Sequence, residues 1–205
     1  VDAEHGYGNA LNVRRTVQEL DAAGAAWLTI EDTLLPQAFG QTKAQLISLE
    51  EGVGKMKAAL DGRGDPSLVI MGRTGAASIS GIDDAIARAK AYEATGVDAL
   101  FFTGVTSRGE LEAISAAISL PIVLGDAPED MSALDYLASQ RVRIALQGHA
   151  PFAAATQAVY ETLKALREGT SPKNLKALAS AELTGRATRD KDVKARSSEF
   201  LGLEK

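Results

Sequence analysis

The sequence contains no cysteine and only two histidines, His5 and His149, in 205 residues. The absence of cysteine excludes disulfide bonds, a thiolate nucleophile and a cysteine-ligated zinc site. No hydrophobic run reaches the roughly 18 residues that a membrane-spanning helix requires. The formal net charge of −5 argues against nucleic acid or an anionic membrane as a partner, because both attract a basic protein face. We therefore expect no nucleic-acid partner, no membrane partner and a cytoplasmic protein.

The pattern along the chain is an apolar strand followed by a helix, repeated. Strands that are apolar almost throughout, each followed by a helix, predict an α/β fold with a parallel sheet covered on both faces. Six strands are predicted, the first around Asp2 and the others at 26–30, 68–71, 98–102, 121–124 and 142–146. Six strands suit an open doubly wound sheet as well as part of a (β/α)8 barrel, which needs eight.

Polar residues help to choose between these folds. They follow several different strands, which is typical of a barrel, whereas an open sheet commonly carries one glycine-rich phosphate loop. No G-x-G-x-x-G motif follows any predicted strand. Three helices are predicted to begin after a serine that has an acidic residue three positions later. These pairs are Ser48 with Glu51, Ser80 with Asp83 and Ser107 with Glu110.

The first nine residues, Val1-Asp-Ala-Glu-His-Gly-Tyr-Gly-Asn9, contain the clearest candidate site. Side chains alternate along a strand, so Asp2 and Glu4 lie on the same side, and the following glycines allow a sharp turn. Two carboxylates at a strand end predict a site for a hard divalent cation such as Mg²⁺, which keeps several of its waters. The alternative is a solvated acidic turn.

A second acidic pair and an arginine follow the next two strands. Glu31 and Asp32 end one strand, and Arg73 ends the next. Acids at neighbouring strand ends repel each other unless positive charge lies between them, which favours a metal held by Asp2, Glu4 and Glu31. Arg73 is predicted either to pair with Glu31 or Asp32, or to clamp a substrate carboxylate with its guanidinium.

Three further residues are candidates for catalysis. His5 and His149 both lie at predicted strand ends, where a histidine can exchange protons near neutral pH. Tyr7, between two glycines, either presents its hydroxyl to the site or packs. The loop 33–40 is long for a connection between a strand and a helix, and its apolar residues predict a lid over the site.

These motifs resemble those of a known superfamily. The segments Asp2–Asn9, Thr29-Ile-Glu-Asp32 and Arg73-Thr74 resemble the isocitrate lyase/phosphoenolpyruvate mutase superfamily, whose usual forms are D-x-D-x-G-Y-G, I-E-D and R-T-[DN]-A. Within it, His5, residues 34–40 and Gly148-His149-Ala150 look like the oxaloacetate decarboxylase branch. The resemblance runs over nearly the whole chain.

The resemblance implies a (β/α)8 TIM-type barrel whose last helix swaps between subunits, and therefore a homo-oligomer, either a dimer or a tetramer. It places the Asp2 strand third, so residues 1–169 hold barrel units three to eight and the first two units are missing. Residues 170–205 are then a C-terminal helical tail, which either packs on another subunit or frays. Without the first two units, the alternative is a non-catalytic fragment of a barrel.

The resemblance also assigns roles. Asp2 resembles the direct Mg²⁺ ligand, Glu4 and Glu31 resemble acids that hold metal-bound waters, and Mn²⁺ is the alternative metal. Arg73 resembles the carboxylate clamp and His149 the histidine that marks the decarboxylase branch. Glu4 departs from the usual aspartate, which moves its carboxylate about 1.5 Å outward. Gly75 and the segment 125–128 lack polar residues that are usual there, which weakens the transfer of substrate specificity.

The expected function is that of a Mg²⁺-dependent carbon–carbon lyase, a carboxy-lyase that converts oxaloacetate, a small 2-oxo dicarboxylic acid, to pyruvate through a metal-stabilised enolate. Arg73 would bind a substrate carboxylate, and His149 would orient the substrate or protonate the enolate. Phosphonopyruvate chemistry is an alternative, because the metal–enolate core is shared. A 2-methylisocitrate-like substrate is disfavoured, because those branches usually carry a cysteine-containing lid.

Overall fold

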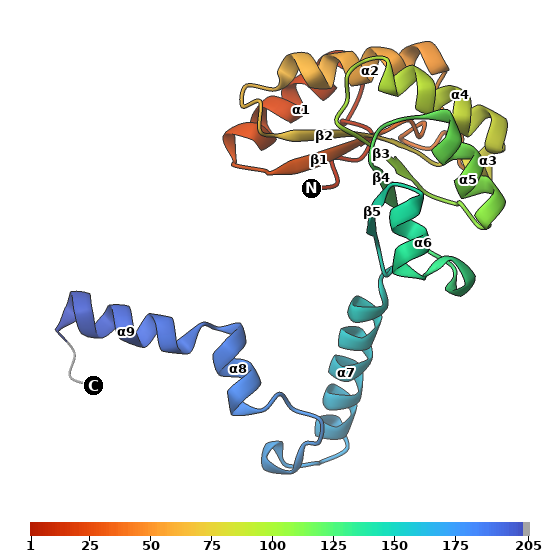
Figure 1. Cartoon of the computed structure of the whole chain (residues 1–205). Helices are drawn as coiled ribbons and strands as arrows, with labels where there is room; N and C mark the ends of the chain where they lie inside the picture. The colour runs from red at the N-terminus through yellow and green to blue at the C-terminus, as the bar shows by residue number, and fades with distance from the viewer. Residues whose placement is uncertain (203–205) are drawn as a thin grey trace. The chain divides into compact units, whose positions relative to one another are not determined.

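The computed structural model describes residues 1–202 (Figure 1). Its internal contacts divide the chain into two compact units, Val1–Gly148 and His149–Lys205. The predicted boundary lies 21 residues later, at 169/170, because the prediction included the last long helix in the barrel. In the structure this helix groups with the C-terminal residues, and its membership of a barrel stays a prediction.

The first unit is built on a parallel sheet whose strands follow one another in chain order. Within residues 1–202 the sheet has five strands: β1 (Trp27–Glu31), β2 (Val69–Thr74), β3 (Ala99–Phe102), β4 (Ile122–Leu124) and β5 (Val142–Ala145). The α/β class and the five strands after the first predicted one are therefore as expected. β1 and β5 lie at opposite edges, so the sheet is open in these residues and no closed barrel is seen.

The first predicted strand, around Asp2, does not form as a strand. Asp2 makes only an isolated parallel bridge to Thr29, in which the Ala3 amide donates to the Thr29 carbonyl at 3.2 Å. Glu4 then adopts a left-handed conformation (φ 51°), which turns the chain away from β1. The prediction of six strands was wrong here because the turn begins after a single paired residue.

The helices of the first unit are amphipathic segments that pack on the strands. They are α1 (Ala10–Ala22), α2 (Leu49–Gly62), α3 (Ala76–Ile79), α4 (Ile82–Glu93), α5 (Arg108–Ala117) and α6 (Leu134–Ser139), with a 3₁₀ turn at Glu129–Met131. Figure 1 shows α1, α2 and α4 along one face of the sheet. Their side chains and those of β1 to β4 form one buried core, to which each fully buried Leu, Ile or Phe contributes about 1.5–3 kcal/mol.

Two of the three predicted serine caps are confirmed. The hydroxyls of Ser48 and Ser107 accept from the amides of the residues three positions later. The prediction for Ser80 was wrong, since the cap of α4 is Gly81 with φ 103°. The short helix α3, which the sequence analysis missed, ends at Ile79 and leaves Ser80 as its own C-terminal cap.

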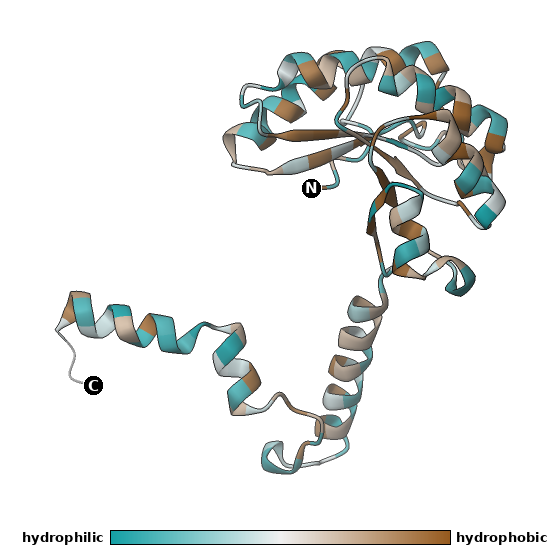
Figure 2. Cartoon of the chain, in the orientation of Figure 1, coloured by the Kyte–Doolittle hydropathy of each residue, from teal (hydrophilic) through white to brown (hydrophobic). Residues whose placement is uncertain are grey.

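Alternation along the strands separates two apolar groups. Leu28 and Ile30 of β1 belong to the helix-facing core, whereas Met71 of β2, Phe101 of β3 and Val123 of β4 form a second cluster on the opposite face. Figure 2 shows the strands as largely hydrophobic, while α1, α2 and α4 alternate between hydrophilic and hydrophobic residues. The face to which the last residue of a strand points therefore depends on whether it is an odd or an even number of residues from those that face the helices.

The second unit is helical. It contains α7 (Ala150–Arg167), a 3₁₀ turn at Pro172–Asn174, α8 (Ala181–Ala187) and α9 (Asp190–Leu201), and between residues 149 and 202 it has no strand. Its helices carry exposed apolar side chains, among them Phe152, Tyr160 and Leu163. Across residues 1–202, no helix is both long enough and apolar enough to pass through a membrane.

Candidate active site

Three of the predicted site residues meet around one guanidinium. Nη1 of Arg73 lies 2.6 Å from Oδ2 of Asp2, and Nε lies 3.0 Å from Oε2 of Glu31. Glu31 and Arg73 are paired residues at the carboxyl ends of β1 and β2, so their side chains leave the sheet on the same face. We call Asp2, Glu31 and Arg73 the Arg73 cluster.

The Arg73 guanidinium also packs on an aromatic ring of the sheet. Its carbon lies 5.1 Å from the centre of the Phe101 ring, a cation–π contact with the neighbouring strand. Nε of Arg73 is buried and is not aligned for a hydrogen bond, although it is 3.0 Å from Glu31, so that contact is mainly electrostatic. Of the two ion pairs predicted for Arg73, the one with Glu31 forms and the one with Asp32 does not.

The backbone fixes the acidic residues. Oδ1 of Asp2 accepts from the Glu4 amide at 2.9 Å and from the Thr29 hydroxyl at 3.4 Å. The Glu31 amide donates to the Glu4 carbonyl at 2.8 Å. Glu4 is therefore locked by its backbone between Asp2 and Glu31, while its side chain is exposed.

Glu31 is the most buried acid of the Arg73 cluster, with 8% of its side chain exposed. Burial raises the pKa of Glu31, the Arg73 guanidinium opposes this rise, and the Glu4 and Asp2 carboxylates add to it. Burial is the main cause of this raised pKa, and the neighbouring carboxylates contribute less than burial or Arg73.

His5 and Tyr7 lie in the turn after Asp2. Their rings make an edge contact with centres 6.0 Å apart, and Tyr7 is mostly exposed. Burial, followed by the nearby Lys55 ammonium, lowers the pKa of His5. The turn places His5 and Tyr7 beside the Arg73 cluster in sequence, and their catalytic roles stay predictions.

Lys55 is a residue that the sequence analysis missed. Its ammonium donates to the His5 carbonyl at 2.9 Å although Lys55 is only 2% exposed. Burial lowers the pKa of Lys55, against the attraction of Glu51, Asp32 and Glu31. A signal existed in the sequence, because Lys55 occupies the buried stripe of α2 together with Gly52, Met56 and Ala59.

Asp32 faces the other way. It is fully buried and its Oδ2 accepts from Arg88 at 3.1 Å and from the Tyr92 hydroxyl at 2.7 Å, both on α4. Burial, then the Asp32 carboxylate, raise the pKa of Tyr92, which keeps this hydroxyl a donor. We call Asp32, Asp84, Arg88 and Tyr92 the Arg88 cluster, and sequence reasoning did not find it.

His149 belongs to the second unit. It is exposed and precedes α7 without a side-chain hydrogen bond to the helix. Its role in the reaction stays a prediction, because the structure brings together only the residues of the first unit.

The fit of Asp2, Glu4 and Glu31 to a divalent cation rests on their charge and on their backbone positions. Within residues 1–202, no three His, Cys, Asp or Glu side chains converge closely enough to enclose an ion. The predicted arrangement, with one direct carboxylate and two that act through waters, does not require such a cage. The Asp2 and Glu31 carboxylates both contact one guanidinium, so one negative charge remains uncompensated, and the Glu4 carboxylate is exposed to solvent. Oxygen donors with an excess of negative charge suit Mg²⁺.

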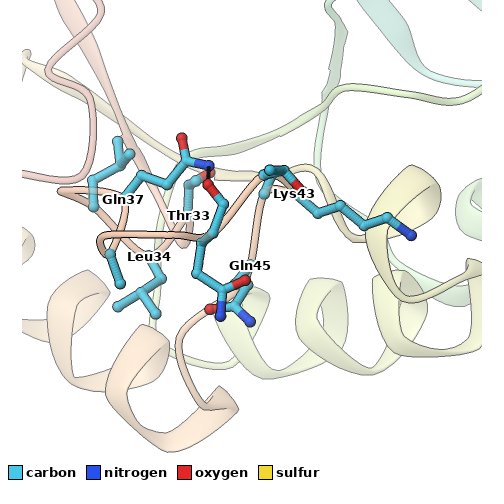
Figure 3. A pocket seen from close by; sticks show the side chains of 10 residues that line it. Thr33, Leu34, Gln37, Lys43 and Gln45 are labelled. Carbon is cyan, nitrogen blue, oxygen red and sulfur yellow. Dashed lines mark hydrogen bonds between the residues drawn. The ribbon is translucent and has the colours of Figure 1, made fainter.

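The loop after β1 folds on itself. It runs from Thr33 to Leu46, which form an antiparallel bridge, and Phe39 at its tip is fully exposed. Figure 3 shows the pocket that the loop encloses, lined by Thr33, Leu34, Gln37 and Gln45, with Lys43 extending away from them. The loop follows Glu31 by one residue, so the predicted lid begins at the Arg73 cluster.

The profile of the family described as "Phosphoenolpyruvate phosphomutase" matches residues 1–167. The chain belongs to this family. The resemblance that the motifs around Asp2, Glu31 and Arg73 predicted is confirmed by a match that includes all three.

Curated relatives align along the whole chain. A protein of Bradyrhizobium diazoefficiens named "Oxaloacetate decarboxylase" is 75% identical over 205 residues, which are 100% of this chain and 71% of that protein. A protein of the same name from Rhodopseudomonas palustris is 68% identical over the same shares of both chains. The branch predicted from His5, residues 34–40 and His149 is therefore the branch of these relatives.

Solved structures of the family share the fold. A phosphonopyruvate hydrolase solved with oxalate and Mg²⁺ is 29% identical, with a TM-score of 0.81, and the match covers 98% of this chain and 71% of that one. The metal and the oxalate are properties of that protein. Its similarity to this chain supports the fold described above and the family membership.

Proposed function

We propose that this protein is a carbon–carbon lyase that decarboxylates oxaloacetate to pyruvate. The observation that carries the proposal is the Arg73 cluster, in which Asp2 and Glu31 both contact one arginine and leave one negative charge uncompensated. The 75% identity to a protein named "Oxaloacetate decarboxylase" supports the substrate.

In this proposal Asp2 binds Mg²⁺ directly, and Glu4 and Glu31 hold its waters, with Mn²⁺ as a substitute. When bound, the metal supplies positive charge near the oxygen that becomes negative as the carbon–carbon bond breaks. The backbone contacts from Asp2 to Glu4 and from Glu4 to Glu31 support this assignment, since they hold the acids in place before any ligand arrives.

Arg73 binds a carboxylate of the substrate in the proposed reaction. The bond to the departing carboxylate breaks, CO₂ leaves, and the electron pair stays on the enolate, which takes up a proton to give pyruvate. Phe101 beneath the guanidinium keeps Arg73 from swinging away. His149 is the proposed proton donor, and His5 and Tyr7 are further candidates that border the substrate.

We also propose that the open sheet is an arc of a (β/α)8 barrel, with residues 1–169 as units three to eight. The helices on one face and the reactive groups at the carboxyl ends of the strands support this arrangement. The exposed apolar residues of α7 support a homo-oligomer in which the C-terminal helices pack on another subunit. The cytoplasm is the proposed location.

The test follows pyruvate release from oxaloacetate by the purified chain with Mg²⁺. We expect release well above the rate with Mg²⁺ alone, and a loss of about 100-fold in the Arg73→Met variant. Arg63→Met is the matched control, because Arg63 pairs with Asp98 in a half-buried contact that the site does not use. Release at the metal-only rate would show that the chain is not a decarboxylase, as expected of a non-catalytic fragment.

Phosphonopyruvate is the second candidate substrate. It is favoured by the 29% identity and TM-score of 0.81 to phosphonopyruvate hydrolase. Assays of both substrates side by side separate the two candidates, since phosphate is released only from phosphonopyruvate. A higher kcat/KM for phosphonopyruvate would replace oxaloacetate as the proposed substrate.

A further inference from the structure

The two ends of the loop after β1 are fastened together. The Leu34 amide donates to the Gln45 carbonyl at 2.8 Å, and the Ile47 amide donates to the Asp32 carbonyl at 2.9 Å. Thr33 and Leu46 form an antiparallel bridge between these contacts. The chain therefore leaves β1 and returns to it through one narrow neck.

A single arginine of α4 holds both sides of this neck. Nη1 of Arg88 donates to the Asp32 carboxylate and Nη2 donates to the Ile47 carbonyl, each at 3.1 Å. Nε is occupied by Asp84 at 2.9 Å. The guanidinium fork thus joins the first and last residues of the neck to one helix, a geometry that lysine cannot reproduce.

The burial of this contact is unusual for a loop. Arg88 and Asp32 expose 8% and 0% of their side chains, so the pair is desolvated, which costs free energy that its attraction must offset. The rest of the loop is held lightly, by bonds such as those from Gln37 and the Gln41 amide within it. Rigidity is concentrated at the neck, and the tip beyond it stays exposed.

We propose that Arg88 is a positioning residue that clamps the neck of loop 33–46, so that the loop closes over the Arg73 cluster as one unit. The inference rests on the proposed function, because closure needs a ligand at that cluster. Arg88 touches no substrate and acts through Asp32 and Ile47. Asp32 adjoins Glu31 in the chain, so the clamp also fixes the start of the lid relative to the site.

Two substitutions in the same cluster separate clamping from general stability. Arg88→Lys keeps the charge beside Asp32 but loses the bond to Ile47. Tyr92→Phe removes one bond to Asp32 and leaves the bond to Ile47 in place. A cluster that only stabilises the fold predicts equal effects of the two changes on the loop at equal loss of Tm.

Limited proteolysis measures how accessible the loop is to a protease, and it requires no assay of activity. Chymotrypsin cuts after Phe39 and trypsin after Lys43, both within the loop, and mass spectrometry follows these bonds. Cleavage by chymotrypsin after Tyr160, exposed on α7, is the internal reference. We expect Arg88→Lys to speed cleavage in the loop about tenfold and Tyr92→Phe less than threefold, because only the former loses the bond to Ile47 that joins the two sides of the neck.

Adding Mg²⁺ with oxalate tests closure. We expect these ligands to slow cleavage after Phe39 and Lys43 in the unaltered chain and in Tyr92→Phe, but not in Arg88→Lys. Equal loop cleavage in both variants would overturn the clamp, and a lack of protection in the unaltered chain would overturn closure. Cleavage without ligand does not depend on the reaction, so the clamp is decided even if oxaloacetate proves not to be the substrate.

Discussion

The Arg73 cluster and the Arg88 cluster begin at adjacent residues of one strand end, Glu31 and Asp32, and lie on opposite faces of the sheet. In the Arg73 cluster the side chain of Asp2 is 51% exposed and that of Arg73 is 20% exposed. In the Arg88 cluster the corresponding values are 0% for Asp32 and 8% for Arg88. The same chemistry, an arginine between acids, is therefore open to ligands on one face and closed on the other.

The two arginines also differ in the number of hydrogen bonds that they make. Arg88 donates hydrogen bonds to Asp32, Asp84 and the Ile47 carbonyl. The Tyr92 hydroxyl donates a further bond to Asp32. Arg73 also lies between two acids, Asp2 and Glu31, but its Nε is poorly aligned for a hydrogen bond. Each cluster keeps one buried atom without a hydrogen bond, Nε of Arg73 and Oδ1 of Asp32. Exposure therefore separates the cluster that a ligand can reach from the one that supports the fold, and this contrast can be tested from both sides.

The largest effect on stability is expected from Asp32→Asn. Removing one partner of a buried ion pair leaves Arg88 undercompensated and costs about 3–5 kcal/mol of the free energy of unfolding. Asp2→Asn, at the exposed pair, should cost less than about 1 kcal/mol. Urea denaturation measures both, and similar losses would contradict the division between the two clusters.

The largest effect on activity is expected from Asp2→Asn. Loss of the proposed metal-binding carboxylate should lower the rate of pyruvate release about 100-fold. Asp61→Asn is the matched control, because Asp61 forms an exposed pair with Arg14 at the same 2.6 Å separation. The assignment of Asp2 fails if both variants keep the activity of the unaltered chain.

Mg²⁺ should stabilise the protein through one cluster alone. At a concentration about 100 times its Kd, the metal should add about 2.7 kcal/mol to the free energy of unfolding. We expect this gain to disappear in Asp2→Asn and to persist in Tyr92→Phe, whose change lies in the Arg88 cluster. Thermal unfolding with and without Mg²⁺ measures the gain, and an unchanged gain in Asp2→Asn would place the metal elsewhere.

The smallest effect on stability is expected at the N-terminal cap of α5, which lies outside both clusters and serves as a reference for the larger effects. Backbone donation from Thr106 lowers the pKa of Glu110, so the stability that its carboxylate contributes is present above its ordinary pKa and is lost as pH falls through the lowered value. Glu110→Gln should cost less than about 1 kcal/mol at pH 7, and the difference should shrink at pH 3. Urea titrations at both pH values test this, and pyruvate release should not change.

Much of the site was predictable from local rules. Glu31 and Arg73 were expected together because parallel strands end at the same edge of a sheet, and the caps at Ser48 and Ser107 follow from short-range hydrogen bonds. The cap at Ser80 was wrong, because the short helix α3 ends there and Gly81 takes the cap position. Nothing near Asp32 in the chain marks Arg88, which is 56 residues away.

The sequence by itself determined that Glu31 and Asp32 point to opposite faces, because side chains alternate along a strand. It also determined that acids, an arginine and a turn follow the strands at one edge, which was enough to indicate a metal-dependent site. Only the tertiary structure decided which face is covered by α4 and which is open. That choice depends on the packing of distant segments, and it makes Asp32 a buried partner of Arg88 while Glu31 stays beside Asp2 and Arg73 with charge left for a ligand.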